Sequence, residues 1–251
     1  MLISIPNEFL FVHIAKTGGS SIRSVLSRDR WRHPYFWAQM VCSRLSSLSG
    51  HRLASKLPRH APVVAAKEML SKQAFEQLFK FAFVRNPWDR MVSAFCHFQR
   101  ERADLLRENR VVSFDDFVHW MIHDAGEYCS HGATFVHAIR RPQWEHLIDL
   151  HGDLVVDRIG RYESLSEDFT SIASHLGFGE VTLPHKRRSN RSYDYRSHFS
   201  AKSVEWVAQY YSMDIKQFDY RFELPEVVSI PFKNQSNDKP LSSEVDFANV
   251  N

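Results

Sequence analysis

The sequence predicts an α/β protein with a mainly parallel sheet, because strand-like and helix-like segments alternate along it. Short, continuously apolar runs occupy residues 8–14 and 79–84, and a third, more mixed run covers residues 153–163. Apolar residues at helical spacing follow each run, an order typical of parallel sheets with helical crossovers. We therefore expect a single domain over residues 1–232. The polar residues 233–251 are expected to form a disordered tail.

The first predicted strand leads directly into a helix. EFLFVHI, residues 8–14, is too short and too continuously apolar for a surface helix, so we expect a buried strand. From Gly19 the pattern becomes helical, with Ile22, Val25 and Leu26 on one face. A short turn that contains two glycines joins the strand to the helix.

The second strand is predicted at FKFAFV, residues 79–84. An Asn-Pro turn follows, and Pro87 suits the first position of a helix, where its missing N–H costs nothing. That helix places Met91, Phe95 and Phe98 on one stripe, which we expect to face the core.

Helices are also predicted around the third strand. Ser164 and Glu167 are spaced as a capping box that opens a helix, and Gly177 can close it. Two further helices are expected over residues 114–124 and 201–213. Each crossover between predicted strands thus contains a helix, as a parallel sheet requires.

The composition is that of a globular chain with modest charge. Its 251 residues are 43% hydrophobic and 13% aromatic, which is sufficient for a packed core. The net charge of +3 argues against binding nucleic acid by charge alone. The 14 histidines would make the surface more basic just below neutral pH.

Neither a membrane segment nor a disulfide framework is predicted. No uninterrupted apolar run approaches the ~18 residues that span a bilayer, and the N-terminus lacks the features of a signal peptide. The three cysteines, Cys42, Cys96 and Cys129, are widely spaced and match no metal-binding pattern. We expect a soluble chain with reduced thiols in a cytosolic setting.

The strand-to-helix turn in FVHIAKTGGSSI, residues 11–22, has the composition of a phosphate-binding loop. Backbone N–H groups at a helix N-terminus point at an anion, and Gly18 and Gly19 let the backbone approach it closely. Lys16 supplies a positive charge. Three hydroxyls add hydrogen-bond donors, those of Thr17, Ser20 and Ser21. The alternative is an ordinary turn with a solvated lysine.

The order of residues in this turn differs from that of an ATP-binding loop. In G-x-x-x-x-G-K-[ST] the lysine follows the last glycine. Lys16 instead precedes both glycines, and no upstream glycine begins such a loop. A kinase that uses ATP is therefore the weaker alternative.

A second candidate anion site lies in FAFVRNPWDRMVSAF, residues 81–95. Arg85 stands at the strand end, where parallel sheets gather ligand-binding groups. Ser93 lies two turns into the following helix, away from its apolar stripe. A guanidinium and a hydroxyl on one side can hold a phosphate. Taken alone, Arg85 would equally suit an ion pair with Asp89.

Together, the two segments resemble the cofactor signatures of the PAPS-dependent sulfotransferases. They are most similar to the carbohydrate sulfotransferase branch, which contains heparan sulfate 2-O-sulfotransferase and its bacterial relatives. The resemblance implies a P-loop-like three-layer α/β domain that binds 3'-phosphoadenosine 5'-phosphosulfate (PAPS) and releases adenosine 3',5'-bisphosphate. It assigns Lys16 through Ser21 to the 5'-phosphosulfate, and Arg85 and Ser93 to the 3'-phosphate. IGRYESLSEDF and YYSMDIKQFDYRF also resemble later family segments.

The resemblance also implies the chemistry. Transfer of a sulfuryl group to a hydroxyl needs a general base and stabilisation of the leaving bisphosphate. Lys16 fits the second role, and His60, ahead of the second strand, takes the first, with Glu68 as the reserve. Two further cofactor contacts are implied in a later basic loop, Arg188 and Ser189.

The implied partner is a hydroxyl acceptor, a glycan or another small molecule, with no nucleic acid, no membrane span and no required metal. His119 and His123 are four residues apart on an expected helix, but no third ligand follows at a recognised spacing. The implied location is the cytoplasm, or a lumenal compartment for a chain trimmed of its anchor. A non-catalytic nucleotide- or glycan-binding protein is the remaining alternative, and the acceptor's identity and the oligomeric state are left open.

Overall fold

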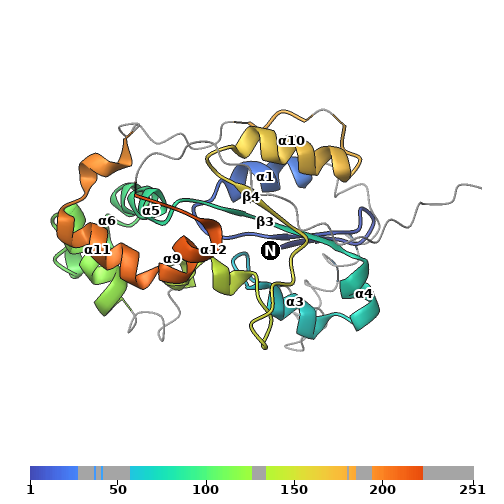
Figure 1. The fold of residues 1–251 in the computed structure, drawn as a ribbon, viewed down its shortest axis with the longest axis horizontal. Helices are drawn as coiled ribbons and strands as arrows, with labels where there is room; N and C mark the ends of the chain where they lie inside the picture. The colour runs from blue at the N-terminus through green and yellow to red at the C-terminus, as the bar shows by residue number, and fades with distance from the viewer. Residues whose placement is uncertain are drawn as a thin grey trace, which may run out of the picture.

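A computed structural model describes five ranges of the chain and two single positions. The ranges are 1–27, 57–125, 134–179, 181–184 and 194–222, and the single positions are Trp37 and Val41. The predicted tail, residues 233–251, lies outside the described residues. Within them, helices cover both faces of one sheet, which gives the expected α/β architecture (Figure 1).

The described residues form a four-stranded sheet in the order β1-β2-β3-β4. The strands are β1 (Leu2–Ser4), β2 (Phe9–Val12), β3 (Phe79–Val84) and β4 (Arg158–Arg161). β1 is antiparallel to β2, whereas β2, β3 and β4 run parallel. The carboxyl ends of these parallel strands therefore meet at one edge of the sheet, where α/β proteins form their ligand sites.

Alternation of side chains divides the buried strands between two faces. Phe9 and Phe11 of β2 contribute to the core on one face, while Leu10 and Val12 contribute to the core on the other. All four side chains are fully buried. A strand covered on both faces needs apolar residues at every position, which is why the sequence pattern is continuous rather than alternating.

Two pairs of helices form the outer layers, above and below the sheet in Figure 1. The upper layer contains α1 (Gly19–Leu26) and α10 (Leu165–His175), and the lower layer contains α3 (Val63–Met69) and α4 (Lys72–Gln77). Ile22 and Phe169 bury the upper pair against the phenylalanine face of the sheet. Val63 and Phe75 bury the lower pair against the opposite face. The domain thus has three layers.

A second group of helices extends from the layered part (Figure 1). It contains α5 (Pro87–Glu101), α6 (Ala103–Glu108), α7 (Phe114–His119), the π-helical η2 (Trp120–Asp124), α9 (Thr134–Arg140), α11 (Ala201–Tyr210), α12 (Ser212–Phe218) and the 3-10 turn η4 (Tyr195–His198). The 3-10 turn η3 (Trp144–His146) instead packs through Trp144 against the core of the lower layer. The predicted stripe of Met91, Phe95 and Phe98 is buried in the core of this group. The helices predicted around residues 114–124 and 201–213 are α7 with η2, and α11 continuing toward α12.

The third strand is shorter than the sequence predicts. Of the predicted residues 153–163, four join the sheet as β4 (Arg158–Arg161). Leu154 instead pairs with Ile148 in an antiparallel bridge, because the chain reverses between them. A local apolar pattern therefore identified the strand but not the point at which it enters the sheet.

The capping box predicted at the start of α10 is wrong. Ser164 has φ −113° and ψ 33°, outside the extended region that lets a capping hydroxyl reach back into the helix. Its hydroxyl instead donates to the Asp168 carboxylate at 2.8 Å, and Glu167 takes no part in a cap. Gly177, as predicted, follows the helix in the left-handed conformation, with φ 73°.

Candidate active site

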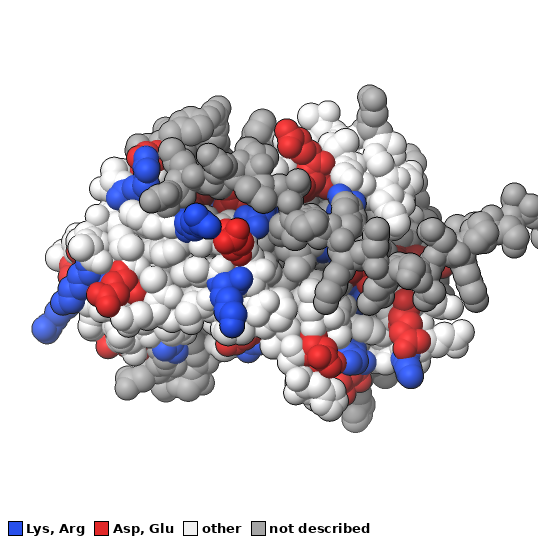
Figure 2. All heavy atoms as spheres, viewed as in Figure 1, with Lys and Arg blue, Asp and Glu red and all other residues white. Residues whose placement is uncertain are grey.

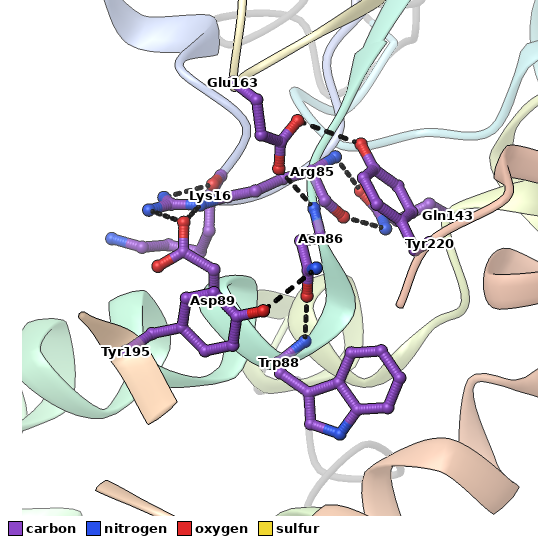
Figure 3. Close-up of polar contacts among 9 residues, drawn as sticks. All are labelled: Lys16, Arg85, Asn86, Trp88, Asp89, Gln143, Glu163, Tyr195 and Tyr220. Carbon is purple, nitrogen blue, oxygen red and sulfur yellow. Dashed lines mark hydrogen bonds and ion pairs between the residues drawn. The ribbon is translucent and has the colours of Figure 1, made fainter. Parts of the chain in front are cut away.

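The two predicted anion sites meet at the carboxyl edge of the parallel strands. The Lys16 loop, residues 16–21, leads from β2 into α1, and Arg85 directly follows β3. The Arg85 Nη1 atom donates a hydrogen bond of 3.1 Å to the carbonyl oxygen of Lys16 (Figure 3). Segments 69 residues apart in the sequence are thus in direct contact, as adjacent parallel strands require.

The backbone of the Lys16 loop adopts a costly conformation. Lys16 has a φ of 71° and Gly18 a φ of 81°, both in the left-handed region. For a lysine this costs on the order of 1–3 kcal/mol, and it persists only where neighbouring contacts impose it. The Arg85 bond to the Lys16 carbonyl is one such contact. The buried Thr17 hydroxyl supplies another, because it donates to the Ile14 carbonyl at 3.1 Å and closes the turn.

Close neighbours explain why the loop contains two glycines. A Cβ atom on Gly18 would lie 2.8 Å from Leu165 Cδ2, and one on Gly19 would lie 2.2 Å from His13 Cδ2. Both distances are far below normal carbon contacts, so a side chain at either position would displace its neighbour. The loop therefore lies directly against α10 and against the ring of His13.

The start of α1 has the features of an anion site. A helix offers no partners to its first backbone N–H groups. In α1 no side chain caps these groups, and the first turn holds no acidic residue. Ser20 is exposed at this end, whereas Ser21 is buried and its N–H donates to the Gly18 carbonyl at 3.0 Å. The arrangement suits a phosphate- or sulfate-like group, because the helix dipole adds favourable potential.

Arg85 is buried and contacted from three directions. Its Nε and Nη2 atoms lie 2.7 and 2.6 Å from Asp89 Oδ2, and its side chain is 3% exposed. The guanidinium carbon lies 3.7 Å from the centre of the Tyr162 ring. The ion pair with Asp89, which the sequence left open as an alternative, is therefore present. The ion pair and the bond to Lys16 engage the guanidinium in joining β3, α5 and the Lys16 loop. Contact of Arg85 with a phosphate stays a prediction.

Ser93 lies on the face of α5 that the sequence predicts. It is four residues after Asp89, a spacing that places both side chains on the same side of a helix. Both residues are half-buried, whereas Met91 and Val92 between them are fully buried in or near the core. Ser93 thus shares a face with the Arg85–Asp89 ion pair.

Sequence reasoning missed Arg90, whose side chain binds backbone carbonyls next to the Lys16 loop. The side chain is buried, its Nε donates to the Ala15 carbonyl at 3.0 Å, and its Nη2 donates to the Ala138 carbonyl at 3.1 Å. Arg90 therefore ties the residue before Lys16 to α9. The sequence did contain a signal for this residue, because Arg90 stands next to Met91 on the apolar side of the predicted helix.

Asn86 and Gln143 were also missed, and both fix the backbone around Arg85 (Figure 3). The Gln143 side chain bonds the N–H of Arg85 at 2.9 Å and its carbonyl at 2.8 Å. The Asn86 N–H donates to the Glu163 carboxylate at 2.7 Å, and the Asn86 side chain donates to the Arg221 carbonyl at 2.8 Å. The end of β3 is thus joined to β4 and to the last described residues of the chain.

The predicted base, His60, lies beside His13. Its Nδ1 atom is 2.8 Å from the His13 carbonyl oxygen. Because a carbonyl can only accept, Nδ1 carries the proton and Nε2 is left with its lone pair. Burial lowers the pKa of His60 to about 4; this hydrogen bond opposes the shift, whereas Arg59 and Arg90 reinforce it. His60 is therefore a neutral ring at pH 7 with its basic nitrogen defined.

The remaining sequence candidates do not join this arrangement. Glu68, the reserve for the base, is exposed on α3. The rings of His119 and His123 are 4.7 Å apart. Across the part of the chain that the structure describes, no group of three potential ligands is placed to hold a metal ion. Arg188 and Ser189 lie outside the described residues.

A glycine-containing loop after one parallel strand and an arginine after the next are typical of α/β proteins that bind phosphorylated ligands. Comparison with known proteins narrows this class, because the model of the sulfotransferase family matches residues 1–221. The chain belongs to the sulfotransferase family, whose chemistry is sulfuryl transfer, and an ATP-dependent kinase is not favoured. It is also similar to an uncharacterised protein of Archaeoglobus fulgidus, with 28% identity over 121 residues, which are 47% of this chain and 84% of that protein.

On the face shown in Figure 2, basic and acidic side chains of the described residues are interspersed. Among the described residues on that face, the charged side chains form no continuous basic surface of the kind that follows a nucleic-acid backbone. None of the helices in the described ranges combines the length and apolar character needed to cross a membrane.

Proposed function

We propose that this sulfotransferase uses PAPS as its donor and transfers the sulfuryl group to a hydroxyl of a carbohydrate. The observation that carries the proposal is the bond between Arg85 and the Lys16 carbonyl, which joins the two segments that resemble the PAPS signatures. The proposal assigns the 5'-phosphosulfate to the Lys16 loop and the 3'-phosphate to Arg85 and Ser93. Two further contacts are proposed outside the described residues, Arg188 and Ser189. Adenosine 3',5'-bisphosphate is the proposed product.

The chemistry of the Lys16 loop fits this donor. Gly18 supplies the left-handed backbone of the turn, and the uncapped N-terminus of α1 attracts negative charge. PAPS supplies an activated sulfuryl group for in-line attack by a hydroxyl. Lys16 is proposed to stabilise the charge that develops on the bridging oxygen as its bond to sulfur breaks.

His60 is the proposed general base. As the acceptor oxygen bonds to sulfur, the hydroxyl proton passes to His60 Nε2. The hydrogen bond from Nδ1 to the His13 carbonyl supports this role, because it leaves Nε2 unprotonated. A pKa of about 4 makes His60 a weak base in the free protein. A bound anionic donor would raise that pKa toward the range in which a base is efficient.

Ligand binding tests the donor independently of the acceptor. Titration with adenosine 3',5'-bisphosphate should raise the thermal unfolding temperature, whereas ATP should have little effect. Lys16→Ala should weaken this stabilisation, and Lys72→Ala, which removes an exposed lysine on α4, should not. Absence of any response of the wild-type protein to the bisphosphate would exclude the proposed donor.

Activity tests the acceptor and the base. Transfer from labelled PAPS should be measured on an array of glycans and small alcohols. Lys16→Ala should reduce turnover by orders of magnitude, and His60→Ala should abolish it while bisphosphate binding is retained. Near-normal turnover of His60→Ala would place the base elsewhere. Bisphosphate binding without transfer to any acceptor would favour the non-catalytic alternative.

A further inference from the structure

The ring of His13 lies between the Lys16 loop and the proposed base. One edge of the ring meets Gly19, where a Cβ atom would approach Cδ2 and Nε2 to 2.2 and 2.3 Å. The ring also meets that of His60 edge-on, with centroids 4.8 Å apart and an interplanar angle of 68°. The ring of Phe11 stacks on the His13 ring on the core side, with centroids 5.5 Å apart. His13 therefore contacts both halves of the proposed reaction centre.

The backbone of His13 contributes a further contact with the base. Its carbonyl accepts the Nδ1–H bond of His60 at 2.8 Å, and this bond defines which nitrogen of His60 is basic. The position and the tautomer of His60 thus both depend on residue 13. The residue lies only three positions before Lys16, so that a shift at His13 would also move the loop.

His13 itself is unsuited to proton transfer. The residue is 3% exposed, and burial together with the nearby His60 holds its pKa at about 2, so the ring stays neutral. Its Nδ1 atom has no hydrogen-bond partner among the described residues. Such a nitrogen costs on the order of 1–3 kcal/mol, which a hydrocarbon side chain would avoid. Simple core packing therefore does not account for a histidine at this position.

We infer that His13 is a positioning residue for sulfuryl transfer, because its ring sets the spacing between the Lys16 loop and His60 and its carbonyl fixes the tautomer of His60. This inference rests on the proposed function. A larger ring at position 13 would overlap Gly19, and a smaller side chain would let loop and base move toward each other. In-line transfer is sensitive to such shifts, since a displacement of about 1 Å can reduce a rate about 100-fold.

The pKa of His60 reports on this arrangement. The charged and titratable groups around the His60 and His13 rings include Arg23, Arg59, Arg90, the N-terminal amino group and His146. Removal of the His13 ring leaves the other groups in place and opens His60 to water. Because burial is the main cause of the low pKa of His60, that pKa should then rise toward its ordinary value.

Two variants and a control test the inference. His13→Ala removes the ring, and His13→Asn keeps a polar side chain of smaller size. Phe9→Leu alters an equally buried side chain at the other end of β2, away from the Lys16 loop. Thermal unfolding first establishes that each variant is folded. NMR titration of the His60 ring then measures its pKa and tautomer without any donor or acceptor.

We expect the pKa of His60 to rise by about one unit in both His13 variants and to stay unchanged in Phe9→Leu. With PAPS and an acceptor, kcat of the His13 variants should fall about 100-fold, while bisphosphate affinity changes less than about 10-fold. The acid limb of the kcat/KM profile should move to higher pH. The inference is overturned if the folded His13 variants match Phe9→Leu in the pKa of His60 or in kcat.

The two proposals fail in different ways. A wild-type protein that does not bind adenosine 3',5'-bisphosphate contradicts the proposed donor, and the rate measurements then lose their meaning. The His60 titration still decides whether His13 controls the base, since it uses the protein alone. An unchanged titration in both folded variants overturns the positioning role regardless of activity.

Discussion

Gly19 shows at the scale of one residue how the Lys16 loop depends on the absence of a side chain. A Cβ atom at Gly19 would lie 2.2 Å from the His13 ring, although the backbone there needs no left-handed conformation. Gly152 is the converse case, because it has a φ of 86° but no atom within 4 Å of an added Cβ. A side chain at Gly19 is therefore excluded by steric contact, whereas one at Gly152 is disfavoured by the backbone conformation.

Gly19→Ala should destabilise the protein by about 1–3 kcal/mol and weaken bisphosphate binding at least ~10-fold, because the added methyl group displaces the His13 ring. The double variant Gly19→Ala/His13→Ala should recover part of the stability, with a coupling energy of about 0.5–3 kcal/mol. Gly152→Ala should cost about 1 kcal/mol and leave binding unchanged. Denaturant unfolding and bisphosphate titration check these values, and strict additivity of the double variant would contradict the contact.

The pH dependence of kcat/KM follows from the His60 ring. The proposed base acts in its neutral form, and burial lowers the pKa of His60 to about 4 in the free protein. The profile of kcat/KM should therefore be level across neutral pH and fall as the pH drops through about 5 to 4. Rates on each side of pH 5 measure this limb. Because a bound donor would raise this pKa, the profile is measured with PAPS as the varied substrate. A limb near pH 6.5 would then mean that the His60 ring is solvated in the free protein.

At the scale of elements, α5 connects the Lys16 loop to the helices around it. Arg85, just before α5, bonds the Lys16 carbonyl, and Arg90 within α5 bonds the Ala15 carbonyl. Two consecutive peptide groups are thus held by two arginines of one segment. This explains in physical terms why the two sequence segments belong together: the second supplies the donors that shape the backbone of the first.

Arg90→Leu should destabilise the protein by about 3 kcal/mol or more. The change leaves buried carbonyls of Ala15 and Ala138 without their donor, and each such group costs about 1–3 kcal/mol. Bisphosphate affinity should fall as well, because the loop loses its anchor. Arg100→Leu provides the matched control on the same helix. Its side chain is 47% exposed, so the expected loss is within about 0.5 kcal/mol by denaturant unfolding. Equal losses in both variants would contradict the anchoring role.

For the molecule as a whole, local sequence patterns were enough to predict the layers but not the contacts between distant segments. The apolar runs of β2 and β3 were predicted because both faces of these strands are buried, and parallel topology then placed Lys16 and Arg85 at one edge. The carbonyl bonds of Arg90 and the contact of Gly19 with His13 join segments through space. No pattern within either segment encodes such a partner, so only the structure reveals these residues.

Buried histidines also set how the whole protein responds to acid. Burial is the largest cause that lowers the pKa of His13, His60 and His146, to about 2 and about 4 for the first two. Below their ordinary pKa of about 6.5, the unfolded chain binds protons that the folded chain does not, so stability falls as the pH drops. The loss stops for each residue once the pH passes its folded pKa.

We therefore expect the free energy of unfolding to fall between about pH 6 and 4 by up to ~1.4 kcal/mol per pH unit for each histidine. The N-terminal amino group, whose pKa burial lowers to about 5, adds a fall that begins near pH 8. Urea unfolding at a series of pH values measures this slope. His146→Gln removes a titrating ring from the core, so the slope of the unfolding free energy with pH should decrease by the contribution of one histidine. His175→Gln, at an exposed position on α10, should leave the slope unchanged. If both variants give the wild-type slope, the acid sensitivity arises from groups other than the buried histidines.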